Sequence, residues 1–239
     1  MELDYVLPWE YSIVMKLTLY HGSESIVEIP KWGLGKATND YGLGFYCTEA
    51  KEMANEWAVG EGRDGYVNFY SIDLDGLTIL DLNSSNFNVL HWLTVLLENR
   101  IFVISSPLAF EAKAYLTENY SVNYNDYDLI KGYRADDSYF SFAQDFISGS
   151  ISLRQLSEAM RLGNLGEQIV LKSKLAFERI VFTGYEISRS DEWFDSRRLR
   201  DSSARRQYLD TVRYGRRKDD LFIAQIIDEG IKGNDPRLR

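Results

Sequence analysis

The residues best suited to chemistry lie in two short stretches, residues 21–23 (His-Gly-Ser) and residues 44–46 (Gly-Phe-Tyr). The first stretch ends a segment of alternating apolar and polar residues, which is typical of a strand. A glycine beside His21 lets a ligand approach the backbone, whose N–H and C=O groups can hydrogen-bond a planar amide. The imidazole can bind a ribose hydroxyl, and the Tyr46 ring can stack on a flat heterocycle. Each residue also has a structural explanation: a strand-end histidine that binds a turn, and a core tyrosine.

Other catalytic arrangements are excluded or disfavoured by the residues available. Two histidines and one cysteine are too few for a His/Cys zinc cluster, and we expect no metal. The chain has no Walker loop, no nucleophile elbow and no Gly-x-Gly-x-x-Gly after a strand. A dyad of Cys47 with His91 is a further option for nucleophilic catalysis. His91 lies between Leu90 and Trp92 in a predicted helix, which favours a packing or surface role.

The bulk composition indicates a folded, acidic protein. Its 239 residues are 45% hydrophobic and carry a net charge of −9, which suits a buried core and is atypical of a general DNA-coating protein. The single cysteine excludes an intrachain disulfide and fits a reducing compartment. No apolar run reaches the roughly 20 residues that span a bilayer, and the acidic start is a poor signal peptide. We therefore expect a cytoplasmic protein without membrane contact.

The chain shows no linker and no internal repeat, so we expect one domain over residues 16–231 and a tail over 232–239. Residues 1–15 are expected to form an N-terminal extension, unless translation begins at Met15, which directly precedes the first predicted strand.

Hydrophobic periodicity predicts an α+β fold in which strands come first and last and helices lie between them. Strands are predicted at 16–22, 42–48, 66–82, 127–133, 167–173 and 178–187. The third of these is divided at Asp75-Gly76, a hairpin-type dipeptide. Helices are predicted at 49–59, 87–100, 111–120, 137–149, 152–163, 202–213 and 220–231. Ser152 and Gln155 have the spacing of a capping box, and Gly163 lies just past the end of that helix.

Positive charge is concentrated in a basic helical segment, residues 196–218. This segment has nine Lys or Arg residues and two Asp, a net charge of about +7, in a chain whose total is −9. One interpretation is a solvated pair of helices whose arginines pair with acidic surface. The other is an edge that faces phosphate groups or nucleic acid. No RNA-reading motif accompanies the charges, which favours the first interpretation.

The motifs "YHGS" and "YGLGFYCTEAKEMANEWA", taken in order, resemble the ADP-ribosyltransferase superfamily on its diphtheria-toxin and poly(ADP-ribose) polymerase side. There a strand ends in His-Gly-Ser/Thr, and Gly-x-Gly-aromatic-Tyr precedes a helix. "GEQIVLKS" is similar to the third-motif strand. Residues 92–100, 126–140, 165–182 and 203–231 are similar to a bacterial family of this superfamily, formerly described only as a domain of unknown function. The resemblance covers about residues 16–231.

The resemblance implies an ADP-ribosyltransferase-like split β-sandwich that binds NAD in a cleft flanked by helices. His21 would bind the ribose of the adenosine half, the Gly22 backbone would hold the nicotinamide carboxamide, and Tyr46 would stack on the nicotinamide ring. The implied NAD-binding residues are His21, Gly22, Ser23, Gly44, Phe45 and Tyr46. Members of the bacterial family commonly occur in toxin–antitoxin or phage-defence settings. The implied activity is therefore mono-ADP-ribosyl transfer by an intracellular toxin or defence effector, with NAD as the substrate.

The third catalytic residue is either Glu167 or Gln168. Neighbours on a strand point to opposite sides, so only one of them can face the cleft. The resemblance favours Gln168. A glutamine can orient the ribose or the acceptor but cannot act as a general base, whereas a carboxylate can also deprotonate the acceptor.

Three further residues have both a structural and a functional interpretation. Asp136 and Asp137 either cap a helix N-terminus or line the cleft and position the acceptor. Arg134 either binds a pyrophosphate or pairs with an acid. The loop 161–166 lies where the superfamily has its target-recognition loop, and its two glycines favour mobility.

Two alternative functions remain open at this point, a catalytically silent module that binds NAD or a nucleotide, and an NAD glycohydrolase that uses water as the acceptor. The target is a nucleic acid or a protein, and a cognate antitoxin protein is a candidate partner.

Overall fold

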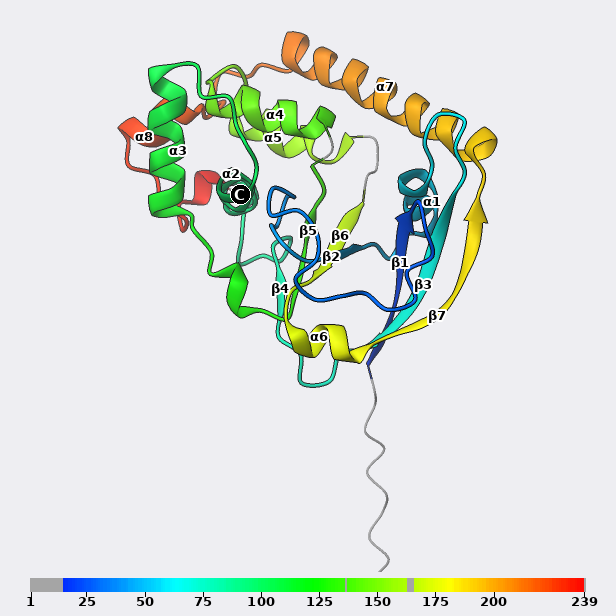
Figure 1. Ribbon diagram of the computed structural model, residues 1–239. Coiled ribbons are helices and arrows are strands. Elements are labelled where there is room, and N and C mark those ends of the chain that lie inside the picture. The colour runs from blue at the N-terminus through cyan, green and yellow to red at the C-terminus, as the bar shows by residue number, and fades with distance from the viewer. Residues whose placement is uncertain (1–14, 136, 163–165, 239) are drawn as a thin grey trace, which may run out of the picture.

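In the computed structural model, residues 15–135, 137–162 and 166–238 are described, and in these ranges the chain forms two β-sheets with helices around them (Figure 1). The predictions for residues 1–14, Asp136 and Gly163 lie outside these ranges. The strands are β1 (Lys16–Ser23), β2 (Phe45–Cys47), β3 (Gly65–Asp73), β4 (Ile79–Asp81), β5 (Leu129–Tyr133), β6 (Glu167–Leu171) and β7 (Ile180–Ser188). The helices are α1 (Lys51–Ala58), α2 (Val89–Asn99), α3 (Pro107–Asn119), α4 (Asp137–Ile147), α5 (Leu153–Ala159), α6 (Lys174–Arg179), α7 (Ser190–Tyr214) and α8 (Ile223–Asp228). The chain is thus mixed α and β, as its periodicity predicts.

The two sheets differ in order and direction. The first has the order β1-β3-β7 and is antiparallel throughout, and the second has the order β2-β6-β5-β4, in which β4 and β5 are parallel. Among the described residues, one backbone bridge joins the sheets where β1 passes the end of β2. The N–H of Tyr20 donates to the carbonyl of Thr48 at 2.8 Å, and the N–H of Thr48 donates back at 2.9 Å. The two sheets are therefore hydrogen-bonded to each other directly beside both motifs, since Tyr20 precedes His21 and Thr48 lies two residues after Tyr46.

The second sheet is buried on both faces. Leu129 and Ile169 point into a cluster shared with Leu19 of the first sheet, whereas Ile130 and Val170 point into the core formed with the helices. Because successive side chains of a strand point to opposite faces, a strand covered on both sides must be apolar at consecutive positions. This explains the consecutive apolar residues Leu129-Ile130 in β5 and Ile169-Val170-Leu171 in β6.

Most of the helical core lies on the face of the second sheet that points away from the first sheet (Figure 1). Trp92 on α2, Phe146 on α4 and Ile226 on α8 are almost completely buried there. The capping box predicted at Ser152 and Gln155 is confirmed. The Gln155 N–H donates to the Ser152 hydroxyl oxygen at 3.2 Å, and the Ser152 N–H donates to Oε1 of Gln155 at 2.9 Å. In the described ranges, each helix is too short or too polar to cross a membrane.

Helix α7 connects the two halves of the structure. It leaves β7 and runs across to the helices beyond the second sheet (Figure 1). Near its middle, Arg200 forms a 2.7 Å ion pair with Glu56 on α1, and both side chains are largely buried. Further along, the Tyr208 ring stacks on Phe142 of α4 with 3.8 Å between centroids. One helix therefore fixes the position of α1 relative to α4.

The structure departs from the predicted secondary structure in three places. The hairpin predicted at Asp75-Gly76 does not form, because β3 and β4 belong to different sheets. Gly76 does turn the chain with a φ of 68°, but Asp128 then accepts a 2.7 Å hydrogen bond from the Thr78 N–H and holds β4 beside β5. Helix α6 lies between the last two predicted strands, and Ser173 caps it by accepting from the Ala176 N–H at 3.1 Å.

Helix α7 begins at Ser190 rather than at residue 202, because the ion pair and the stacked ring described above stabilise a stretch with little apolar periodicity. At the other end of the chain, the expected tail over 232–239 contributes Leu238 to the helical core, where it is 5% exposed.

We predict that Gly22→Ala destabilises the protein by about 3 kcal/mol or more, at the upper end of overpacking effects. A Cβ at this position would lie 2.0 Å from the carbonyl oxygen of Ala54 and 2.8 Å from the nitrogen of Ala58, both backbone atoms of α1. Urea denaturation measures the change. The control is Gly233→Ala, where the nearest atom is the His91 ring at 3.6 Å, an ordinary contact. Equal stabilities of the two variants would contradict the close packing of α1 on β1.

Candidate functional site

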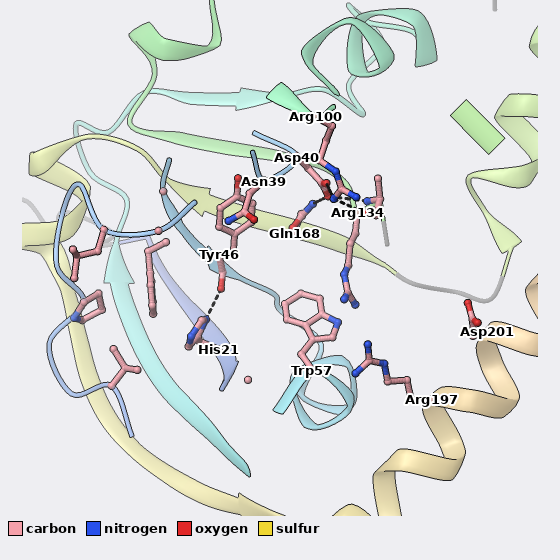
Figure 2. Close-up of a pocket in the computed structure, with 18 of the residues that line it drawn as sticks. His21, Asn39, Asp40, Tyr46, Trp57, Arg100, Arg134, Gln168, Arg197 and Asp201 are labelled. Carbon is pink, nitrogen blue, oxygen red and sulfur yellow. Dashed lines mark hydrogen bonds and ion pairs between the residues drawn. The ribbon is translucent and has the colours of Figure 1, made fainter. Parts of the chain in front are cut away.

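A cavity of about 980 Å³ lies where the two sheets meet. Its walls come from β1, β2 and β6, from α1 and α7, and from the loops before β2 and after β5 (Figure 2). This volume is in the range of small-molecule sites. The cavity brings together segments that are more than a hundred residues apart in the sequence.

His21 lies in the cavity wall, and a hydrogen bond fixes the proton on its ring. Its Nδ1 is 2.7 Å from the carbonyl oxygen of Tyr46, and its ring lies 4.4 Å from that of Phe45 (Figure 2). A carbonyl only accepts, so Nδ1 must carry the proton and Nε2 keeps its lone pair in the neutral ring. Burial lowers the pKa of His21, although the bond to the Tyr46 carbonyl opposes this shift. Near neutral pH the ring therefore offers one hydrogen-bond acceptor, which suits a hydroxyl donor.

Gly22 lines the cavity, but Ser23 does not lie among the described residues of its wall. Gly22 has no room for a side chain because α1 packs directly on it, so this glycine has a packing function in addition to any approach by a ligand. The Ser23 hydroxyl accepts from the side-chain amide of Asn68 at 3.0 Å and donates to the carbonyl of Ser25 at 2.6 Å. Ser23 therefore holds the loop that follows β1.

Gly44, Phe45 and Tyr46 all line the cavity. The Tyr46 hydroxyl is used within its own loop, since it donates to the Gly42 carbonyl at 2.6 Å and accepts from the Tyr41 N–H at 3.0 Å. Burial raises the pKa of this hydroxyl well above its ordinary value. Tyr46 can therefore meet a ligand only with its ring.

The structure separates the two candidates for the third residue. Gln168 is 4% exposed and lines the cavity, where its Nε2 donates to Asp40 at 2.8 Å and to the Tyr133 carbonyl at 3.3 Å (Figure 2). Glu167 lies on the other side of β6, where it binds Asn83 at 2.5 Å and Lys131 at 2.8 Å. Because both neighbours of the Gln168 amide nitrogen are acceptors, the amide orientation is fixed and Oε1 remains as an acceptor.

Asp40 is a site residue that the sequence analysis missed. It is 6% exposed, and it accepts from the Ala135 N–H at 2.9 Å and forms a 2.9 Å ion pair with Arg100. Burial raises the pKa of Asp40, while bonds from Ala135 and Gln168 and the charges of Arg100 and Arg134 oppose the shift. Its position directly before the "YGLGFY" motif was the available signal, because a charged residue beside an aromatic-glycine turn needs a partner.

Arg134 lines the cavity and lies over the ring of Trp57, with 4.4 Å between the guanidinium carbon and the ring centroid. Asp136 lies outside the described residues. Asp137 is the first residue of α4, which fits the helix-start interpretation of its position. Half of the proposed target-recognition loop 161–166, residues 163–165, also lies outside the described ranges.

The basic helical segment contributes to the cavity, which sequence patterns did not predict. The cavity-lining residues of α7, five of which belong to this segment, are Phe194, Arg197, Arg198, Arg200, Asp201 and Arg205. Three of these arginines are paired with acids, Arg200 with the buried Glu56, Arg205 with Asp201 at 3.1 Å and Arg198 with Asp195 at 3.8 Å. Part of the charge is therefore structural and part of it faces the cavity.

No Cys47–His91 pair forms within the described ranges. Cys47 is fully buried between the sheets, and burial raises the pKa of its thiol. His91 completes a capping box at the start of α2, where its Nδ1 accepts from the Asn88 N–H at 3.1 Å, and its ring packs against Phe87 and Tyr120. The packing role favoured for His91 is therefore what the structure has. The described residues include no group of three or more His, Cys, Asp or Glu arranged to hold a metal ion.

The fold and cavity define a mixed α and β protein with a ligand-sized site at the junction of two open sheets. Residues 17–182 match the family model described as "protein of unknown function (DUF3990)", and the chain belongs to this family. No curated protein and no solved structure matches the chain.

We predict that the two histidines occupy opposite tautomers at pH 7.5. His21 should carry its proton on Nδ1, which faces a carbonyl, and His91 on Nε2, because its Nδ1 accepts from a backbone N–H. Long-range ¹H–¹⁵N NMR distinguishes the tautomers, and His91→Asn assigns the signals.

Burial lowers the pKa of both rings in the folded protein. The unfolded chain then binds more protons below its histidine pKa of about 6.5, so stability should fall as the pH drops through that value. Identical tautomers, or a rise in stability from pH 7 to pH 5.5 that the histidine variants abolish, would contradict this prediction.

We predict that Asp40→Asn lowers the free energy of unfolding by about 2–4 kcal/mol. One amide oxygen cannot accept from Arg100, Ala135 and Gln168 together, and the partly buried Arg100 guanidinium loses its anionic partner. Denaturation in urea measures the loss. Glu24→Gln is the matched control, because it breaks an exposed 2.7 Å pair with Arg63 and should cost at most about 1 kcal/mol. Losses of the same size in the two variants would show that Asp40 does not organise the site.

Proposed function

We propose that this protein is an NAD-dependent mono-ADP-ribosyltransferase whose two sheets form the split β-sandwich of that superfamily. The observation that carries the proposal is the meeting of three separate motifs in one cavity. His21 and Gly22 end β1, Tyr46 lies on β2, and Gln168 lies on β6, 122 positions beyond Tyr46, yet all four line the same wall. Residues chosen for their resemblance to NAD-binding motifs would not otherwise be expected to converge.

The residues present fit the parts of NAD. The Nε2 lone pair of His21 can accept from a ribose hydroxyl, and the Gly22 backbone lies in the wall where a carboxamide would bind. The Tyr46 ring is the only part of that side chain still open to a ligand, which suits stacking on nicotinamide. The fixed Oε1 of Gln168 can accept from a second ribose hydroxyl or from the acceptor.

In this reaction the bond from the ribose anomeric carbon to the nicotinamide nitrogen breaks, the acceptor bonds to that carbon, and the acceptor proton passes to water. The chain's own contribution is to position the ribose. General-base catalysis by Gln168 is excluded, since an amide cannot take a proton. Glu167 cannot replace it from the opposite side of β6, where Lys131 pairs with it. This favours transfer of a single ADP-ribose over chain elongation.

The proposed setting is that of an intracellular toxin or phage-defence effector, with a nucleic acid or a protein as the target. The setting rests on the family resemblance of the sequence. A cognate antitoxin would be a partner, and the net charge of −9 together with the basic α7 provides surfaces of both signs for target and partner.

We predict that incubation with labelled NAD and bacterial extract transfers label to a macromolecule and releases an equal amount of nicotinamide. Separate nuclease and protease treatments then identify the target class. His21→Ala and Gln168→Ala should lower the rate roughly a hundredfold or more while the fold is kept. Glu167→Gln is the matched control, because the neighbouring side chain faces away from the cavity and should retain most activity.

Other outcomes point to other functions. Nicotinamide release without a labelled macromolecule indicates an NAD glycohydrolase, and thermal stabilisation by NAD without release indicates a silent binding module. The proposal is refuted if wild-type protein releases no nicotinamide and is not stabilised by NAD.

A further inference from the structure

The indole nitrogen of Trp57 is a buried donor without a partner in the part of the chain that the structure describes. Trp57 lies near the end of α1, and its side chain forms part of the cavity wall (Figure 2). A buried tryptophan N–H usually finds a hydrogen-bond partner, because an unmet donor costs about 1–3 kcal/mol. Since this N–H belongs to a residue in the wall of a ligand-sized cavity, a ligand acceptor is the natural partner.

Two guanidinium groups lie beside this indole. Arg134, from the loop after β5, stacks over the Trp57 ring at 4.4 Å. Arg197, from α7, lines the same cavity, and Figure 2 shows its guanidinium group next to Trp57 on the side of Arg134. The three donors come from three different elements, so the tertiary structure assembles them.

The charge around Arg197 is not neutralised locally. Arg197 forms no ion pair among the described residues, and its polar contact there is a long one, 3.5 Å to the Val59 carbonyl. The two acids in the cavity wall, Asp40 and Asp201, are engaged with other arginines. An arginine that faces a cavity beside a neutral donor favours an anion there, because its planar fork matches phosphate oxygens.

We propose that Trp57, Arg134 and Arg197 form a subsite for the diphosphate group of a nucleotide. Two cations and one neutral donor suit the negative charge and the acceptor oxygens of a diphosphate. Because Trp57 belongs to the inner wall formed by α1, the group that reaches it must enter the cavity, which favours a small nucleotide over the backbone of a folded nucleic acid. The identity of the nucleotide as NAD rests on the proposed function, whereas the anion subsite is tested without turnover.

The test is calorimetric titration with ADP, which has the diphosphate but no nicotinamide, and with inorganic pyrophosphate. We expect the Kd for ADP to rise about tenfold or more in Arg197→Gln, and to rise also in Trp57→Phe, which keeps a ring beneath Arg134 but removes the N–H. Arg206→Gln is the matched control, because it removes one positive charge from an exposed position on the same helix outside the cavity wall. Its Kd should change less than twofold. Circular dichroism and urea denaturation verify that each variant is folded.

Several results would overturn the subsite: no binding of ADP by wild-type protein, an unchanged Kd in Arg197→Gln, or equal losses in Arg197→Gln and Arg206→Gln. If Arg197→Gln left ADP binding unchanged but reduced the labelling of a macromolecule, Arg197 would be assigned to acceptor binding, and the subsite would also be overturned. The two proposals fail separately. If Arg197→Gln selectively loses ADP binding and the wild-type protein shows no NAD turnover, the subsite is supported and the transferase is refuted. If the wild-type protein turns over NAD and Arg197→Gln leaves ADP binding unchanged, the transferase is supported and the subsite is refuted.

Discussion

The backbone bridge between Tyr20 and Thr48 is the contact on which the site depends, because it is where the two sheets are hydrogen-bonded to each other. One residue further along β1, His21 donates to the carbonyl of Tyr46, so the same junction fixes both a sheet-to-sheet contact and the tautomer of a site residue. The buried cluster between the sheets holds this junction together. The part of the site at this junction is held precisely, because His21, Tyr46 and Gln168 all lie on strands.

The cavity is completed by polar groups that stabilise one another. Asp40 receives hydrogen bonds from Ala135 and Gln168 and pairs with Arg100, and this network orients the Gln168 amide toward one set of partners. A buried carboxylate is costly unless it is paired and hydrogen-bonded, so the network has to form as a unit. Gln168 thereby keeps one orientation before any ligand binds.

Helix α7 places part of the positive charge of the chain in the wall of the candidate site. Arg200 is anchored in a buried pair with Glu56, whereas Arg197, less than one turn earlier, lines the cavity beside Trp57. The same helix reaches α4 through Tyr208 and Phe142. Its arginines thus divide into those that hold the helix in place and those that add positive charge to the cavity.

The sequence by itself determined the local elements: alternation gave β1, apolar spacing gave α1 and α2, and Ser152 with Gln155 gave the cap of α5. It also indicated His21, Gly22 and Tyr46 as residues of interest through their short motifs, and it left Glu167 and Gln168 as alternatives. Only the tertiary structure decided that β4 leaves β3 for the second sheet, that Ser23 faces its own loop, and that Asp40, Trp57 and Arg197 join the cavity. The reason is physical: periodicity reports which face of an element is buried, whereas long-range pairing and the convergence of charged side chains depend on which elements pack together.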